Sequence, residues 1–83
     1  MDYVFTGKSF KQLQKLPKSV QKRIIAKLDF YSSHPNPIRF ADHLTKFDLG
    51  TYRYRVGDYR IVFDIDAENL LILLIDHRKN IYR

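Results

Sequence analysis

The fold of this 83-residue chain is decided by residues 52–63, which read YRYRVGDYRIVF. Apolar or aromatic residues alternate there with arginines, which is the pattern of strands that bury one face. Gly57 and Asp58 interrupt the alternation, and a glycine at that point supplies the positive φ of a two-residue hairpin turn. The stretch therefore predicts two antiparallel strands, over residues 52–56 and 59–65.

The two-residue turn also fixes the register of this hairpin. It places Arg55 opposite Arg60, and position 53 opposite position 62. Three arginines then share one face of the sheet, which we call the arginine face: Arg53, Arg55 and Arg60. The tyrosines, Ile61 and Phe63 share the other face, which we expect to pack against helices.

The arginine face is the feature that most clearly points to a ligand. Two arginines directly opposite each other destabilise a sheet by about 0.2–1 kcal/mol. A bound anion would neutralise this repulsion, and a guanidinium group binds phosphate through two parallel hydrogen bonds. The alternative is that these side chains extend into solvent or pair with acids such as Asp58 or Asp76. The geometry favours a phosphate site.

The segments around the hairpin complete an α+β fold. Residues 2–6 predict a strand, and Thr6 is placed to cap a helix that starts near Lys8. Pro17 ends this helix and suits the first turn of a second one, which residues 32–37 terminate. The inward positions recur at helical spacing: Phe10, Leu13 and Leu16 in the first helix, and Val20, Ile24, Leu28 and Tyr31 in the second.

The second half of the chain supplies most of the sheet. Residues 38–50 predict a connector with one helical turn, and residues 70–75 are apolar on both faces, as in a central strand. The expected architecture is an N-terminal strand, a two-helix hairpin and three antiparallel strands in one sheet, with the helices packed on one face. Residues 1–83 are expected to form a single domain.

Charge and composition restrict the partners. The chain carries 15 Lys and Arg against 9 Asp and Glu, and residues 1–38 hold seven of the basic residues but only two acids. This balance indicates a polyanionic partner such as nucleic acid, although a solvated lysine-rich helix face would give the same count. The sequence has no cysteine, no signal-peptide pattern and no apolar run long enough to cross a bilayer. We therefore expect a cytoplasmic protein without a membrane partner.

The C-terminal tail adds groups that could transfer a proton. If the second turn pairs Asp66 with Asn69, Arg60 lies opposite Ile75 and His77 falls on the arginine face. Arg78 and Tyr82 then lie at the edge of that face. A base, an acid and several arginines around one phosphate could cleave RNA without a metal ion or other cofactor.

Two motifs resemble the RelE/ParE toxin superfamily. Residues 52–63 are similar to its central motif, and the tail 77–83 (HRKNIYR) resembles its C-terminal motif, in which a His-Arg pair is followed shortly by a tyrosine. The Leu16-Pro17 junction between two helices is also typical of the family. The resemblance spans nearly the whole chain. It implies a toxin of a toxin–antitoxin pair that an antitoxin protein holds inactive.

RelE-like members cut mRNA in the ribosomal A site, without metal, and leave a 2′,3′-cyclic phosphate and a 5′-hydroxyl. By this resemblance the catalytic residues are Arg60, Arg78, Tyr82 and His77, with either His77 or Tyr82 as the proton-transfer group. Residues that would bind RNA are Arg53, Arg55, Lys79 and Arg83. The ParE-like branch instead inhibits DNA gyrase by binding it, and a basic RNA- or protein-binding module without activity is a third interpretation. His34 and His43 lack ligand-spaced partners, so no metal site is expected.

Overall fold

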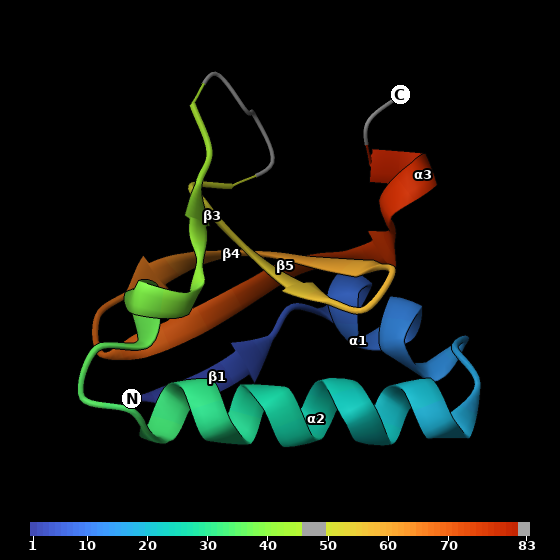
Figure 1. Cartoon of the computed structure of the whole chain (residues 1–83), viewed down its shortest axis with the longest axis horizontal. Coiled ribbons are helices and arrows are strands. Elements are labelled where there is room, and N and C mark those ends of the chain that lie inside the picture. The colour runs from blue at the N-terminus through green and yellow to red at the C-terminus, as the bar shows by residue number, and fades with distance from the viewer. Residues whose placement is uncertain (46–49, 82–83) are drawn as a thin grey trace.

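The computed structural model describes residues 1–45 and 50–81 (Figure 1). Its strands are β1 (Asp2–Phe5), β2 (Asp42–His43), β3 (Tyr52–Val56), β4 (Tyr59–Asp66) and β5 (Asn69–His77). Its helices are α1 (Gly7–Gln14), α2 (Lys18–Ser33), the 3₁₀ helix η1 (Pro37–Phe40) and α3 (Arg78–Ile81). None of the helices in these two ranges is long and apolar enough to cross a bilayer.

The sheet has the strand order β1-β5-β4-β3-β2. β1 runs parallel to β5, and the other neighbours are antiparallel. The apolar strand β5 is internal, as predicted, and the α+β class with helices on one face is confirmed (Figure 1). The strand count is higher than expected because the connector contributes β2, and residues 78–81 of the polar tail form α3.

The helices begin where the sequence indicates. The Thr6 hydroxyl accepts a hydrogen bond from the Ser9 backbone N–H at 3.1 Å, which caps α1. Pro17 lies one residue before α2 rather than inside its first turn. The prediction that Phe10 faces inward is wrong, because this side chain is 47% exposed. Ser9 is buried instead, and its hydroxyl donates to the Ile72 carbonyl of β5 at 2.7 Å.

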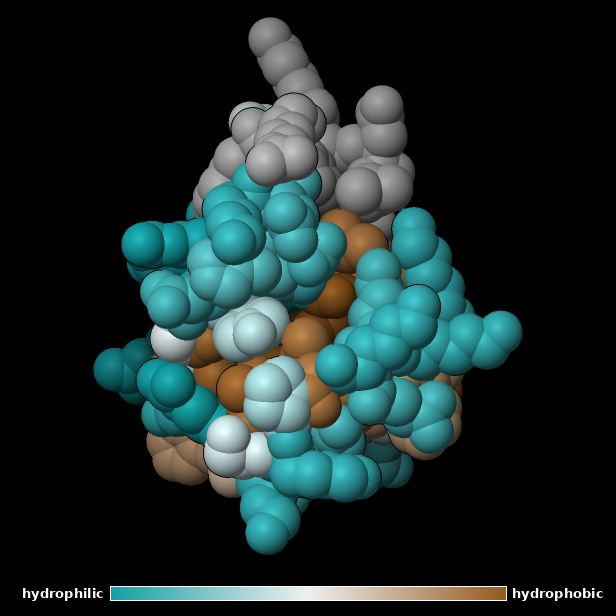
Figure 2. Space-filling model, turned by 90° about the vertical axis from the view of Figure 1, so that its right-hand side faces the viewer, coloured by the Kyte–Doolittle hydropathy of each residue, from teal (hydrophilic) through white to brown (hydrophobic). Residues whose placement is uncertain are grey.

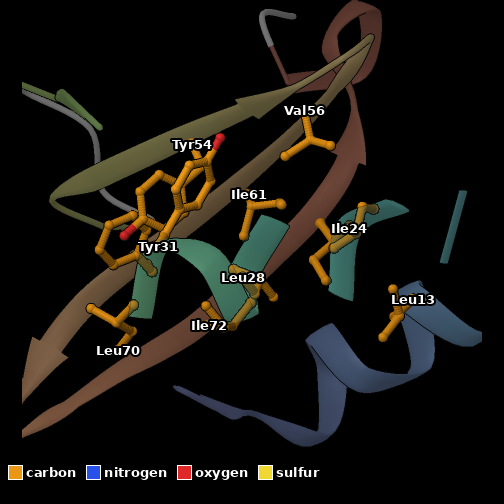
Figure 3. Close-up of a cluster of buried hydrophobic side chains, with 11 residues drawn as sticks. Leu13, Ile24, Leu28, Tyr31, Tyr54, Val56, Ile61, Leu70 and Ile72 are labelled. Atoms are coloured by element: carbon orange, nitrogen blue, oxygen red, sulfur yellow. The ribbon is translucent and has the colours of Figure 1, made fainter. Parts of the chain in front are cut away.

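The core lies between the helices and one sheet face. Figure 3 shows side chains from α1, α2 and the sheet pointing toward one another, and they include Leu13, Ile24, Leu28, Tyr54, Ile61 and Ile72. Tyr54 is fully buried, with its ring centroid 4.2 Å from that of Tyr31 and 4.3 Å from that of Phe63. Its hydroxyl donates to the Pro37 carbonyl at 2.8 Å, so the core also fixes η1.

Three tyrosines are held in the neutral form. Burial raises the pKa of Tyr31, and burial together with the neighbouring Tyr31 raises the pKa of Tyr54. Burial raises the pKa of Tyr3 to about 12, assisted by the hydrogen bond to Asp29 and the negative charge of that residue. The phenol groups of these tyrosines therefore stay protonated near neutral pH.

The sheet face opposite the helices is covered in part by Gly50. Val62 and Leu74 pair on that face, yet both are buried. A β-carbon at Gly50 would lie 2.5 Å from Val62 Cγ1 and 3.1 Å from Leu73 Cδ1. The backbone can approach β4 and β5 this closely because residue 50 has no side chain.

Gly50→Ala should therefore destabilise the fold. Overpacking of a filled site costs about 1–3 kcal/mol, and each kcal/mol corresponds to roughly 4–8 °C of melting temperature in a domain of this size. Gly7→Ala is the matched control, because a β-carbon at Gly7 meets nothing within 4 Å. Thermal unfolding followed by circular dichroism compares the two variants, and equal melting temperatures would contradict the close approach at Gly50.

Candidate functional site

The register of the β3–β4 hairpin is the one the sequence predicts. Arg55 lies opposite Arg60, position 53 opposite position 62, and Val56 opposite Tyr59. Gly57 has a φ of +59°, which confirms the reason for a glycine in the turn. The two sheet faces are also as expected, since Tyr54, Ile61 and Phe63 belong to the core beneath the helices.

The register between β4 and β5 agrees with the prediction from Asp66 back to Phe63 and differs from Val62 back to Tyr59. Asp66 pairs with Asn69 as expected, but a bulge at Leu73 shifts the pairing, so that Val62 lies opposite Leu74. Arg60 therefore faces Asp76 and not Ile75, and the prediction that His77 shares the arginine face is wrong. The residue opposite His77 is Tyr59, which packs on the core side. An extra residue in a strand inverts the facing of every later side chain.

Arg60 is the central residue of the site. Its side chain is only 8% exposed, and Nη1 donates to the carbonyls of Gly57 at 2.9 Å and Tyr59 at 3.0 Å. Its Nε is buried and has no hydrogen-bond partner among residues 1–45 and 50–81. Within residues 1–45 and 50–81, no carboxylate lies within 4.0 Å of this guanidinium, although Asp76 is its neighbour on β5. A buried cation with an unsatisfied donor fits an anionic ligand, because such a group is costly without a partner.

The turn at Gly57-Asp58 brings the tail to Arg60. The Arg78 backbone N–H donates to the Asp58 carbonyl at 2.7 Å, and Arg78 Nε lies 3.7 Å from Asp58 Oδ1. Both side chains of that ion pair are largely exposed, so the pair adds little stability and leaves Arg78 accessible. Arg60 and Arg78, which the sequence assigned to one site, are thus attached to the same two-residue turn.

His77 has a structural contact of its own. Its Nδ1 accepts a hydrogen bond from the Lys79 backbone N–H at 3.2 Å, at the start of α3. The His77 backbone N–H and the Asn80 side chain both donate to Asp76 Oδ1, at 2.7 and 3.0 Å. Because Nδ1 is the acceptor, the proton of the neutral imidazole is on Nε2, which can then only donate. This arrangement makes His77 a capping residue of α3.

Arg53 and Arg55 contact an acid that the sequence did not suggest. Asp42 Oδ2 accepts from Arg53 Nη2 at 2.8 Å and lies 3.2 Å from Arg55 Nε. The predicted partners were Asp58 and Asp76, but the acid comes from β2, which pairs with β3. Asp42 therefore offsets part of the positive charge at the β3 end of the arginine face. No periodicity marks residues 42–43 as a strand, so the sequence carried no signal for this contact.

The remaining candidates are placed as follows. His34 Nδ1 accepts from the Asn36 N–H, and His43 stacks on Tyr52, so both histidines have local packing roles as predicted. The part of the chain that the structure describes has no cluster of three or more residues suited to hold a metal ion. Lys79 is exposed on α3. Tyr82 and Arg83 lie outside the described residues.

Figure 2 shows the end of the molecule that carries α1 and α3, which is the right-hand side of Figure 1. An apolar hollow lies in the middle of this end, and hydrophilic side chains surround it. Because Arg78 of α3 is bonded to Asp58, the β3–β4 turn belongs to this end of the molecule.

Comparisons with known proteins agree on the type of protein. Residues 3–82 match the family model described as ParE toxin of type II toxin-antitoxin system, parDE. Toxin RelG of Mycobacterium tuberculosis is 33% identical over 81 residues, which cover 95% of this chain and 92% of that toxin. Toxin RelE3 of Methanocaldococcus jannaschii is 30% identical over 84 residues, with coverage of 99% and 96%.

Two solved structures share the fold. One is the toxin-antitoxin complex RelBE2 from Mycobacterium tuberculosis, with a TM-score of 0.77, 30% identity, and coverage of 93% of this chain and 96% of that one. The other is the RelB-RelE antitoxin-toxin complex from Methanococcus jannaschii, with a TM-score of 0.68, 26% identity, and coverage of 95% and 94%.

Proposed function

This chain belongs to the ParE toxin family of type II toxin–antitoxin systems, of the RelE/ParE kind, and we propose that it is an endoribonuclease that cleaves mRNA on the ribosome. The observation that carries the proposal is the state of Arg60: a nearly buried guanidinium with an unpartnered Nε, no carboxylate partner among the described residues, and Arg78 attached to the same turn. Such a pair suits a phosphodiester whose charge increases during reaction.

The proposed chemistry is an attack by the ribose 2′-oxygen on the adjacent phosphorus. The 2′-hydroxyl proton leaves to a base, the bond from phosphorus to the 5′-oxygen breaks, and that oxygen takes up a proton. The products are a 2′,3′-cyclic phosphate and a 5′-hydroxyl. Arg60 and Arg78 stabilise the negative charge that builds up on the phosphoryl oxygens, and this role requires donors that are already positioned.

Proton transfer is assigned to Tyr82 in this proposal. The assignment rests on the family resemblance of the tail, whereas the hydrogen bond from Lys79 to His77 Nδ1 supports a positioning role for His77. Lys79 and Arg83 are proposed to bind the RNA backbone, together with Arg53 and Arg55. No step of this chemistry needs a metal ion or an organic cofactor.

The proposed partners are mRNA on the ribosome and an antitoxin protein, and the proposed location is the cytoplasm. Both structural relatives were solved as complexes with an antitoxin. The basic residues of α1 and α2 are opposed by a single acid on those helices, Asp29, so an acidic or amphipathic antitoxin segment would complement this side. Co-expression with the small protein encoded beside this chain should restore growth.

The deciding experiment adds the purified protein to a cell-free translation mixture and maps mRNA ends by primer extension. New 5′ ends within translated codons are expected, together with unchanged supercoiling by DNA gyrase in a parallel assay. Inhibited supercoiling with intact mRNA would replace the proposal with the ParE-like activity. Salt-sensitive RNA binding without new ends or gyrase inhibition would leave only a binding module.

A further inference from the structure

Arg23, on α2, approaches the same turn from the helix layer. A β-carbon at Gly57 would lie 2.8 Å from Arg23 Nη1, 3.0 Å from Cζ and 3.0 Å from Nη2. Three nearly equal distances mean that the guanidinium plane lies flat against Gly57. Gly57 therefore has two functions, since it supplies the positive φ of the turn and leaves room for this side chain.

The turn thus collects three guanidinium groups from three elements. Arg23 packs on Gly57, Arg60 donates to the Gly57 carbonyl, and the Arg78 backbone bonds to Asp58. Asp58 is exposed, and it lies near Arg78 only at the long distance of 3.7 Å. Within the described ranges, neither Arg23 nor Arg60 has a carboxylate within 4.0 Å. Three cations around one turn repel one another unless an anion lies between them.

The presence of an arginine and not a lysine at position 23 supports a specific role for this side chain. Residues 1–38 contain seven basic residues, and Arg23 is the single arginine among them. A lysine would supply the same charge, but a guanidinium can stack on a flat peptide surface and still present a fork of N–H donors to a phosphate. Arg23 is also exposed, so its donors remain accessible to a ligand.

We infer that Arg23 is an additional substrate-binding residue, which holds an RNA backbone phosphate next to the one that Arg60 and Arg78 hold. This inference rests on the proposed function. Arg23 binds the substrate in the ground state and in the transition state alike. Its loss should therefore weaken RNA binding without slowing the chemical step.

The test compares Arg23→Gln, Arg23→Lys and Lys22→Gln. Lys22 is the matched control, because it is the exposed neighbour on α2 and its replacement removes the same charge. The measurements are kcat and KM for cleavage of mRNA on programmed ribosomes, and the affinity of each variant for a short single-stranded RNA at several salt concentrations.

Arg23→Gln should raise KM about tenfold with kcat within about twofold, since one charge-assisted contact is worth about 1.5 kcal/mol or more. The slope of log affinity against log salt should fall by about 0.7, which corresponds to one lost phosphate contact on single-stranded RNA. Arg23→Lys should recover part of the affinity, and Lys22→Gln should change each parameter by less than about twofold.

The inference is overturned if Arg23→Gln matches Lys22→Gln in affinity and salt slope, or if it lowers only the melting temperature. In that case Arg23 is a packing residue beneath the turn. Failure of the proposed function gives a different result, namely no cleavage by the unmodified protein. The RNA-affinity comparison still decides the role of Arg23 in that event, because it needs no turnover.

Discussion

Arg60→Ala should lower the rate of the proposed mRNA cleavage by about 10²–10³-fold while the chain stays folded. This size of effect is typical of removing one preorganised donor that stabilises a developing negative charge. Arg60 is preorganised in this sense, since two backbone carbonyls fix Nη1 while the buried Nε has no hydrogen-bond partner among the described residues. Single-turnover cleavage on programmed ribosomes measures the loss.

Arg60→Ala should also lower the stability of the fold slightly. From the sequence alone, Arg60→Ala would remove the repulsion between Arg55 and Arg60 and would therefore cost no stability. The structure changes this expectation. Arg60 Nη1 donates hydrogen bonds to the Gly57 and Tyr59 carbonyls, and these bonds hold the turn together. Loss of these bonds outweighs the relief of repulsion by about 1 kcal/mol, or roughly 4–8 °C in melting temperature.

Arg60→Lys is the control, because it keeps the charge but has no planar fork. It should retain the fold and recover only part of the rate. Full activity of Arg60→Ala would remove this residue from the site. Complete unfolding of both variants would show instead that the guanidinium is a structural element of the hairpin.

The hairpin could be predicted in detail because its register depends on local chemistry alone. A two-residue turn with glycine first leaves one way to pair the flanking residues, and the burial of Tyr54 and Ile61 then selects the face. The arginine face follows from these two constraints, before any contact with the rest of the chain is known.

The features that could not be predicted depend on contacts between distant segments. In the apolar run 70–75, every register buries similar side chains, so nothing local shows that Leu73 forms a bulge. Asp42 reaches Arg53 and Arg55 only because β2 pairs with β3. Arg23 lies 34 residues before Gly57, and only the fold brings them together.

The bulge has a direct consequence for the catalytic assignment. Without it, His77 would lie on the arginine face beside Arg60, where it could serve as a base. With it, His77 lies opposite Tyr59, their ring centroids are 5.4 Å apart, and its Nδ1 caps the first turn of α3. The imidazole therefore holds α3, and with it Arg78, against the turn.

His77→Asn should consequently keep cleavage within a few-fold of the unmodified protein. Asparagine is a good capping residue, and its side-chain oxygen can accept the Lys79 N–H in place of Nδ1. His77→Leu, which cannot accept this hydrogen bond, should lower activity more than asparagine does, through displacement of α3. Tyr82→Phe should lose about 10²–10⁴-fold, the usual contribution of a proton-transfer group.

The three variants separate positioning from proton transfer when rates are measured across a range of pH. If His77 only positions α3, the pH–rate profile of His77→Asn keeps its shape and Tyr82→Phe changes it. If His77→Asn is as inactive as His77→Leu and Tyr82→Phe remains active, the imidazole is the proton-transfer group. The tail must then rearrange when RNA binds, because Nδ1 would have to release the Lys79 N–H before it could accept a proton from the 2′-hydroxyl.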